Sequence, residues 1–126
     1  ELSAESAWEY ELAVTKISVA ALLNVRWLKR QLTVPENIQR VVSEYFAISL
    51  RDLKGKKRNR SFARPRQMAM ALSRELTGNS YPEIGLAFDG RDHSTVIHAC
   101  DRIAELRQTE AQLNEDYSTL LRQLQA

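Results

Sequence analysis

The sequence contains few of the residues that cross-link a chain or interrupt helices. Its 126 residues include one cysteine, four glycines and three prolines. The single cysteine, Cys100, excludes an intramolecular disulfide, which fits a reducing compartment such as the cytoplasm. The longest apolar stretch, residues 17–25, is interrupted by Ser18 and Asn24 and is too short to span a bilayer. The composition therefore favours one soluble domain, or one domain with an attached helix.

Strand patterns are also scarce, because few stretches alternate apolar and polar residues. Apolar residues instead recur three and four positions apart, which predicts an all-α fold. We expect helices close to residues 4–32, 33–46, 50–53, 62–77, 81–88, 92–107 and 112–126. Residues 1–32 are interpreted as a linker helix or a segment added from elsewhere, and residues 33–126 as a helix-turn-helix domain. Because the chain begins with Glu1 and shows no signal-peptide pattern, we expect a fragment or a processed product.

Capping residues mark the expected helix ends. Thr33 and Glu36, and again Ser80 and Glu83, have the spacing of a capping box with a proline in the first turn. Gly78 is the expected stop of the helix at 62–77. The residues expected to form the core are Ile38, Val41, Val42, Tyr45, Phe46, Met68, Ala69, Ala71, Leu72, Leu76, Ile84, Leu86, Ala87, Phe88, Val96, Cys100, Ile103, Leu106, Leu113, Tyr117, Leu120, Leu121 and Leu124.

Residues 80–107 have the dimensions of a helix-turn-helix unit. A short helix is followed by a turn at 89–91 and by a longer helix that begins near Asp92. Helix pairs of this size are common, so the pattern alone is weak support for DNA binding.

Positive charge is concentrated in residues 51–66. This segment carries eight Lys/Arg and one acidic residue, whereas the whole chain carries 18 Lys/Arg and 16 Asp/Glu. A local basic patch indicates a polyanionic partner, although a charge run is as often a solvated surface. Arg64 and Arg66, which flank Pro65 at the expected helix start, and the following Gln67 are predicted to contact phosphates with the backbone N–H groups of that helix start.

Hydrogen-bonding side chains crowd the first turn of the helix that begins near Asp92. The run Asp92–Thr95 is followed by His98 and Arg102, which share a helix face with Thr95 because positions i, i+3 and i+7 lie close in angle. The first residues of a recognition helix commonly read bases in the major groove, and Arg102 is placed to reach a phosphate. The alternative for Asp92 is that its carboxylate only caps the helix.

The same residues do not have the spacing of a catalytic or metal site. Asp92, His93 and Ser94 are the residue types of a hydrolase triad, but adjacent helical residues point about 100° apart and do not form that relay. His93 and His98 are five positions apart, off the spacing of a helical metal pair, and Cys100 does not complete a ligand set. Since the sequence has no Walker-type phosphate loop, we expect no enzyme activity, no metal and no cofactor for this chain.

Two runs of the sequence resemble a known family. Gly90–Val96 (Gly-Arg-Asp-His-Ser-Thr-Val) and Arg58–Met70 (Arg-Asn-Arg-Ser-Phe-Ala-Arg-Pro-Arg-Gln-Met-Ala-Met) are similar to the C-terminal DNA-binding domain of the bacterial replication initiators of the DnaA family. The resemblance runs from about Leu32 to the end of the chain. It implies a Trp-repressor-like helix-turn-helix that binds nonameric DnaA boxes of the replication origin, consensus TTATNCACA, as a monomer per box. It also implies a cytoplasmic, nucleoid-associated protein whose AAA+ ATPase module lies outside this chain.

The resemblance further assigns roles to single residues. It implies that Arg58 enters the minor groove of double-stranded DNA. The residues implied to face the major groove are Tyr81, Pro82, Asp92, His93, Ser94 and Thr95. The phosphate contacts implied by the resemblance or by the charge pattern are Lys56, Lys57, Arg60, Arg64, Arg66, Gln67, Arg74, His98 and Arg102.

Two other functions stay open at this point. One is a related helix-turn-helix module that binds RNA or hairpin DNA in a transposition-type protein. The other is a helical interaction module whose basic loop docks on an acidic protein. Regulatory proteins that dock on the exposed face of the domain are expected as further partners.

Overall fold

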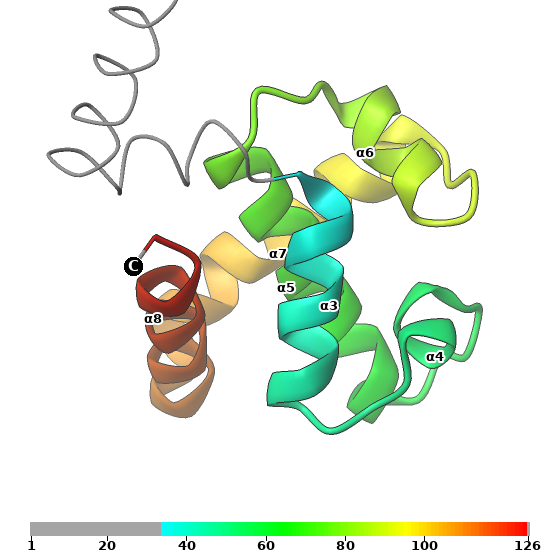
Figure 1. The fold of residues 1–126 in the computed structure, drawn as a ribbon. Coiled ribbons are helices and arrows are strands. Elements are labelled where there is room, and N and C mark those ends of the chain that lie inside the picture. The colour runs from blue at the N-terminus through cyan, green and yellow to red at the C-terminus, as the bar shows by residue number, and fades with distance from the viewer. Residues whose placement is uncertain (1–33, 126) are drawn as a thin grey trace, which may run out of the picture. The chain divides into compact units, whose positions relative to one another are not determined.

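The structure, a computed structural model, describes residues 34–125 of the chain. All regular secondary structure in this range is helical, as the apolar spacing predicted. In chain order the helices are α3 (Pro35–Tyr45), α4 (Leu50–Lys54), α5 (Arg60–Leu76), α6 (Tyr81–Ala87), α7 (His93–Thr109) and α8 (Ala111–Gln125), coloured from cyan to red in Figure 1. The helix expected at residues 4–32 and the cap expected at Thr33 lie outside the described residues.

Helix α5 is the central element of the domain. It packs against α3, α4, α6 and α7, while α8 packs against α3 and α7 (Figure 1). The five residues predicted for the core of α5, from Met68 to Leu76, are all buried. Among residues 34–125, no helix combines the length and the apolar character that crossing a bilayer requires.

Two residues expected in the core are exposed, and five are only partly buried at its edge: Val41, Phe46, Ala87, Cys100 and Leu121. Leu86 is 74% exposed, because α6 buries Ile84 and a position two residues further along points about 200° away. Tyr45 is also exposed, and its hydroxyl donates a hydrogen bond to Asp116 in α8 (2.8 Å). Cys100 is half-buried at the edge of the core.

The boundaries of α5 differ from the prediction at both ends. The helix begins at Arg60, two residues earlier than expected, so Pro65 lies inside the helix rather than at its start. At the other end, Thr77 closes the helix by donating its N–H to the Ser73 carbonyl (3.0 Å). Gly78 does not adopt the left-handed conformation of a glycine stop.

The turn between α6 and α7 depends on two glycines. Asp89 and Gly90 have φ values of 59° and 72°, a left-handed conformation that glycine adopts readily and aspartate more readily than most residues. Gly85 is needed for space, since a Cβ there would lie 2.2 Å from the Arg91 carbonyl oxygen. The Arg91 N–H donates to the Gly85 carbonyl (2.9 Å), so the turn folds back directly onto α6.

Candidate nucleic-acid interface

Helix α6 opens with the capping box predicted from the sequence. Ser80 Oγ accepts a hydrogen bond from the Glu83 N–H (3.3 Å), and the Glu83 carboxylate accepts one from the Ser80 N–H (3.0 Å). The backbone N–H of Ser80, followed by its hydroxyl, lowers the pKa of Glu83. Helix α6, the turn and α7 therefore form a helix-turn-helix unit whose first helix is fixed by local hydrogen bonds.

The first turn of α7 presents an ionised carboxylate to solvent. Asp92 is the N-cap residue of α7, but its side chain makes no hydrogen bond to the helix backbone. Instead, one of its oxygens accepts a hydrogen bond from Ser94 Oγ, and the other lies 3.1 Å from His93 Nδ1. The hydrogen bond from Ser94 is the main cause of the lowered pKa of Asp92. Asp92 therefore occupies the N-cap position of α7, while its carboxylate is held by Ser94 in place of a capping hydrogen bond.

A groove between α5 and α7 gathers several of the predicted contact residues. Thr95, His98 and Arg102 line its α7 side, as the helical spacing predicted, and Gln67 lines its α5 side. Arg102 Nη1 lies 3.2 Å from a carboxylate oxygen of Glu105, but the two side chains are 46% and 66% exposed. An exposed ion pair of this kind contributes at most about 1 kcal/mol, so an anion in the groove can replace Glu105 as the partner of Arg102.

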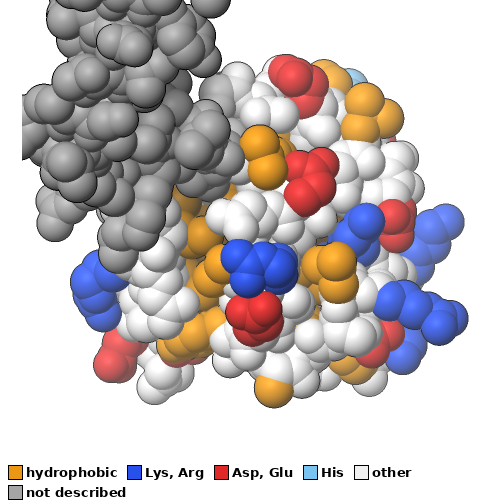
Figure 2. All heavy atoms as spheres, viewed as in Figure 1, with side chains coloured by type: hydrophobic (Ala, Val, Ile, Leu, Met, Phe, Trp, Pro, Cys, Tyr) orange, Lys and Arg blue, Asp and Glu red, His pale blue; other side chains and the backbone are white. Residues whose placement is uncertain are grey.

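The basic patch lies on α4 and on the loop that follows it, residues 55–59, which we call the basic loop. Figure 2 shows Lys and Arg side chains gathered in this region, at the right of the view. Lys56, Arg58 and Arg60 are exposed. Lys57 Nζ lies 3.2 Å from the Asp52 carboxylate, and this contact is the main cause of the lowered pKa of Asp52.

The charges of two other arginines, Arg60 on α5 and Arg102 on α7, affect Arg64 on α5. Burial, followed by the charges of Arg60 and Arg102, lowers the pKa of Arg64. Arg64 Nη1 also donates to the side-chain oxygen of Gln67 (2.9 Å). Because like charges within range of one another destabilise the free protein, an anion bound between them would be stabilising.

Arg66 lies in an environment different from the one expected. Its side chain is only 7% exposed, and it donates to the carbonyls of Asp52 (2.9 Å), Leu53 (2.6 Å) and Lys57 (3.0 Å). Carbonyls at the C-terminal end of a helix such as α4 lack partners within the helix, and the guanidinium supplies them. The predicted phosphate contact of Arg66 is therefore corrected to an internal role that orders the basic segment.

The start of α6 is held by a stacked pair. The Arg74 guanidinium lies 4.2 Å from the centre of the Tyr81 ring and donates to the Asn79 carbonyl (3.1 Å). Tyr81 is half-buried, whereas the next residue, Pro82, is exposed. A cation–π contact of this kind fixes the orientation of both side chains.

Comparison with known proteins identifies the family of the chain. A family model described as the bacterial dnaA protein helix-turn-helix matches residues 35–103, which include α3 to α6 and most of α7. The chain belongs to this family. The chromosomal replication initiator protein DnaA of Acinetobacter baylyi is 56% identical over 118 residues, which cover 94% of this chain and 25% of that protein. The protein of the same name from Acinetobacter baumannii strain AYE is 56% identical over 116 residues, which cover 92% and 24%.

The chain therefore spans about a quarter of the length of these DnaA relatives. The region that it shares with the family is the DnaA helix-turn-helix, which is a DNA-binding module and not a catalytic one. This agrees with the expectation from the sequence that the chain is not an enzyme.

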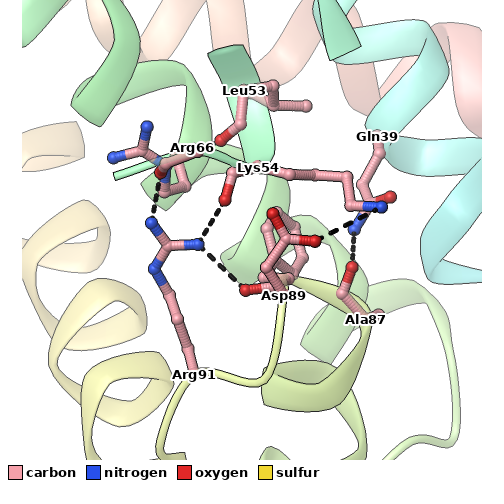
Figure 3. Close-up of polar contacts among 9 residues, drawn as sticks. Gln39, Leu53, Lys54, Arg66, Ala87, Asp89 and Arg91 are labelled. Carbon is pink, nitrogen blue, oxygen red and sulfur yellow. Dashed lines mark hydrogen bonds and ion pairs between the residues drawn. The ribbon is translucent and has the colours of Figure 1, made fainter. Parts of the chain in front are cut away.

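The sequence alone did not reveal the role of Arg91 in this DnaA domain. Its guanidinium donates to the carbonyls of Lys54 (2.6 Å), Phe88 (2.9 Å) and Gly55, as Figure 3 shows. One signal was present in the sequence: Arg91 stands just before α7, where the helix dipole disfavours a cation. A cation at such a position indicates that its side chain interacts with groups outside the helix.

Proposed function

We propose that the chain binds double-stranded DNA at DnaA boxes of the TTATNCACA type, as one monomer per box, in the initiation of chromosomal replication. The observation that carries this proposal is the link between two predicted contact elements. Arg91, in the turn before α7, is hydrogen-bonded to Lys54 and Gly55, and the exposed Arg58 follows three residues after Gly55. A groove-reading helix and a basic loop are thus joined in one surface, as recognition of both DNA grooves requires.

In this proposal the first turn of α7 reads bases in the major groove. The ionised Asp92 carboxylate is suited to accept from a cytosine amino group, and His93 and Thr95 offer further polar contacts. Tyr81 and Pro82 approach the same groove from the start of α6. Ser94 acts by orienting Asp92, because its hydroxyl already donates to that carboxylate.

The basic loop supplies the second part of the proposed contact surface. Arg58 enters the minor groove next to the α7 contacts, where a narrow groove has a strongly negative potential. The proposed phosphate contacts are Lys56, Lys57, Arg60, Arg64, Gln67, Arg74, His98 and Arg102.

The wider role is proposed from the relatives. Because they are named chromosomal replication initiator proteins, we propose that this chain directs such a protein to its origin. An ATPase module in the rest of the protein, regulatory proteins docked on this domain and a location in the nucleoid belong to the same proposal.

Fluorescence anisotropy with labelled duplexes tests the proposal. We expect a duplex that contains TTATCCACA to bind more tightly than a scrambled duplex by roughly 4 kcal/mol, which is about a thousandfold in Kd. Arg58→Ala and His93→Ala should each weaken binding to the box by about 1–3 kcal/mol. Arg122→Ala, which removes the same charge from an exposed position on α8, is the matched control and should leave affinity unchanged.

Other results of this experiment would point to other functions. Equal affinity for both duplexes would contradict box recognition and favour a domain that binds RNA or hairpin DNA. No binding to either duplex would favour the protein-interaction module.

A further inference from the structure

Arg91 connects two segments that are far apart in the sequence. It lies in the turn between α6 and α7, and two of its three carbonyl acceptors, Lys54 and Gly55, are 37 and 36 residues earlier in the chain. The third acceptor, Phe88, belongs to the same turn (2.9 Å). Figure 3 shows the guanidinium between the end of α4 and the turn, with dashed lines to both. A second contact joins the same two segments, because Lys54 Nζ lies 3.7 Å from the Asp89 carboxylate. Arg91 supplies three hydrogen bonds to this junction, two of them to the segment that follows α4.

The basic loop has two internal anchors with different attachments. Arg66 bonds Asp52, Leu53 and Lys57 from the central helix α5, so it ties the segment to the core. Arg91 bonds Lys54 and Gly55 from the turn before α7, so it sets where the loop lies relative to the recognition helix. Burial lowers the pKa of both arginines, and the charge of Arg91 adds to the effect on Arg66.

The anchor at Gly55 limits the position of Arg58. Three residues of fully extended chain span at most about 10 Å, so Arg58 stays within that distance of a point fixed to the turn. On the other side of Arg91, the next residue is Asp92 and the recognition helix begins at His93. The Arg91 guanidinium, together with the Lys54–Asp89 ion pair, thus limits the separation between the two parts of the interface.

We propose that Arg91 is a positioning residue for DNA recognition, which holds the basic loop so that Arg58 and the first turn of α7 engage the same site. This inference rests on the function proposed above. Arg91 need not touch DNA, because its donors face the protein backbone. Its contribution to affinity passes through Arg58.

A double-mutant cycle tests this coupling. Anisotropy with the TTATCCACA duplex is measured for the wild type, Arg91→Ala, Arg58→Ala and the double variant. We expect Arg91→Ala to weaken binding roughly tenfold in the wild-type background and about twofold or less in the Arg58→Ala background, as for coupled residues. Arg40→Ala, at an exposed ion pair on α3, is the charge-matched control and should behave as the wild type in both backgrounds. Additive losses for Arg91→Ala and Arg58→Ala would overturn the inference.

A measurement without DNA separates this inference from the proposed function. Backbone nitrogen-15 relaxation should show larger-amplitude motion at residues 55–58 in Arg91→Ala than in the wild type, while α5 and α7 stay rigid. Unchanged relaxation at 55–58 would overturn the positioning role even if the wild type prefers the box. Conversely, a wild type that shows no preference for the box would contradict the proposed function, whatever the motion of the loop.

A lysine variant keeps the test decisive if Arg91→Ala does not fold. Lysine carries a single ammonium group and does not reproduce the planar fork of arginine donors. Arg91→Lys should therefore give an intermediate loss of box affinity and intermediate motion at 55–58. Wild-type values for both would overturn the inference.

Discussion

The two segments proposed to meet DNA are held in place in different ways. The helix-turn-helix is ordered mainly by short-range contacts: the capping box at Ser80, the left-handed pair Asp89–Gly90 and the hydrogen bond from Arg91 to Gly85. One distant side chain also contributes, because Gln39 Nε2 donates to the Ala87 carbonyl (2.7 Å). The basic segment, residues 52–57, is ordered from outside, because its carbonyls accept hydrogen bonds from guanidiniums 9 to 37 residues further along the chain.

Because of this difference, a substitution affects the segment that contains it, a segment elsewhere in the chain, or both. A change inside the helix-turn-helix acts on the stability of the unit that contains it. A change at Arg66 acts on a segment elsewhere in the chain, whose own sequence is unaltered. A change at Arg91 acts on both segments, because its side chain bonds Phe88 in the turn and Lys54 and Gly55 in the basic segment. The conformation of the helix-turn-helix depends mainly on contacts within it, whereas the conformation of residues 52–57 depends on side chains from α5 and from the turn before α7.

The largest loss of stability is expected from Gly85→Ala, which changes the helix-turn-helix. The added methyl group would meet the Arg91 carbonyl oxygen at 2.2 Å, so α6 and the turn must move apart. We expect the free energy of unfolding to fall by about 3 kcal/mol, measured by urea denaturation followed by circular dichroism. Gly78→Ala is the matched control, since a Cβ there meets no atom within 4 Å, and its stability should change by less than about 0.5 kcal/mol. Equal losses in the two variants would show that the close approach at Gly85 is unimportant.

A smaller loss of stability is expected from Arg66→Ala, which removes hydrogen bonds that hold residues 52–57. Three carbonyls lose their donor, and we expect the free energy of unfolding to fall by about 2 kcal/mol. Hydrogen exchange should show faster amides at 52–57, while the amides of α6 remain protected. Arg66→Lys should recover only part of the loss, because lysine lacks the fork of donors. If α6 lost protection together with residues 52–57, the two segments would not be independent.

The smallest effect is expected from Ser80→Ala, which removes one local contact. Loss of an N-cap hydroxyl lowers the free energy of unfolding by about 1 kcal/mol. The pKa of Glu83, lowered in the wild type by the backbone N–H and then the hydroxyl of Ser80, should rise in the variant, as followed by NMR titration. In the folded protein the pKa of Glu83 is below its ordinary value. The contribution of the Glu83 carboxylate to stability is therefore fully present above the ordinary pKa, and it is lost as the pH falls through the lowered pKa. A Glu83 pKa that does not move would rule out a part for the hydroxyl in stabilising the carboxylate.

The same contrast explains how much of the structure the sequence could predict. The helices within residues 34–125, the capping box at Ser80 and the turn at 89–91 depend on neighbours a few residues apart, and these predictions are confirmed. The face shared by Thr95, His98 and Arg102 follows from helical spacing for the same reason.

Some failures of prediction concern contacts between distant residues, and others, such as Leu86 and the ends of α5, are local. The eight Lys/Arg of residues 51–66 do not indicate which side chain is buried. The burial of Arg66 and the hydrogen bonds of Arg91 both depend on how α4 packs against its neighbours. Leu86 was assigned to the core by its apolar character, but a helix as short as α6 buries only one side.

The enclosure of Arg66 also alters the expected dependence of DNA binding on ionic strength. Each cation that replaces a counterion on duplex DNA contributes about 0.9 to the slope of log K against log salt. Although residues 51–66 contain eight Lys/Arg, the buried Arg66 displaces no counterion. The number of ions released on binding therefore reflects the cations left on the surface, and it is smaller than the charge of the segment suggests.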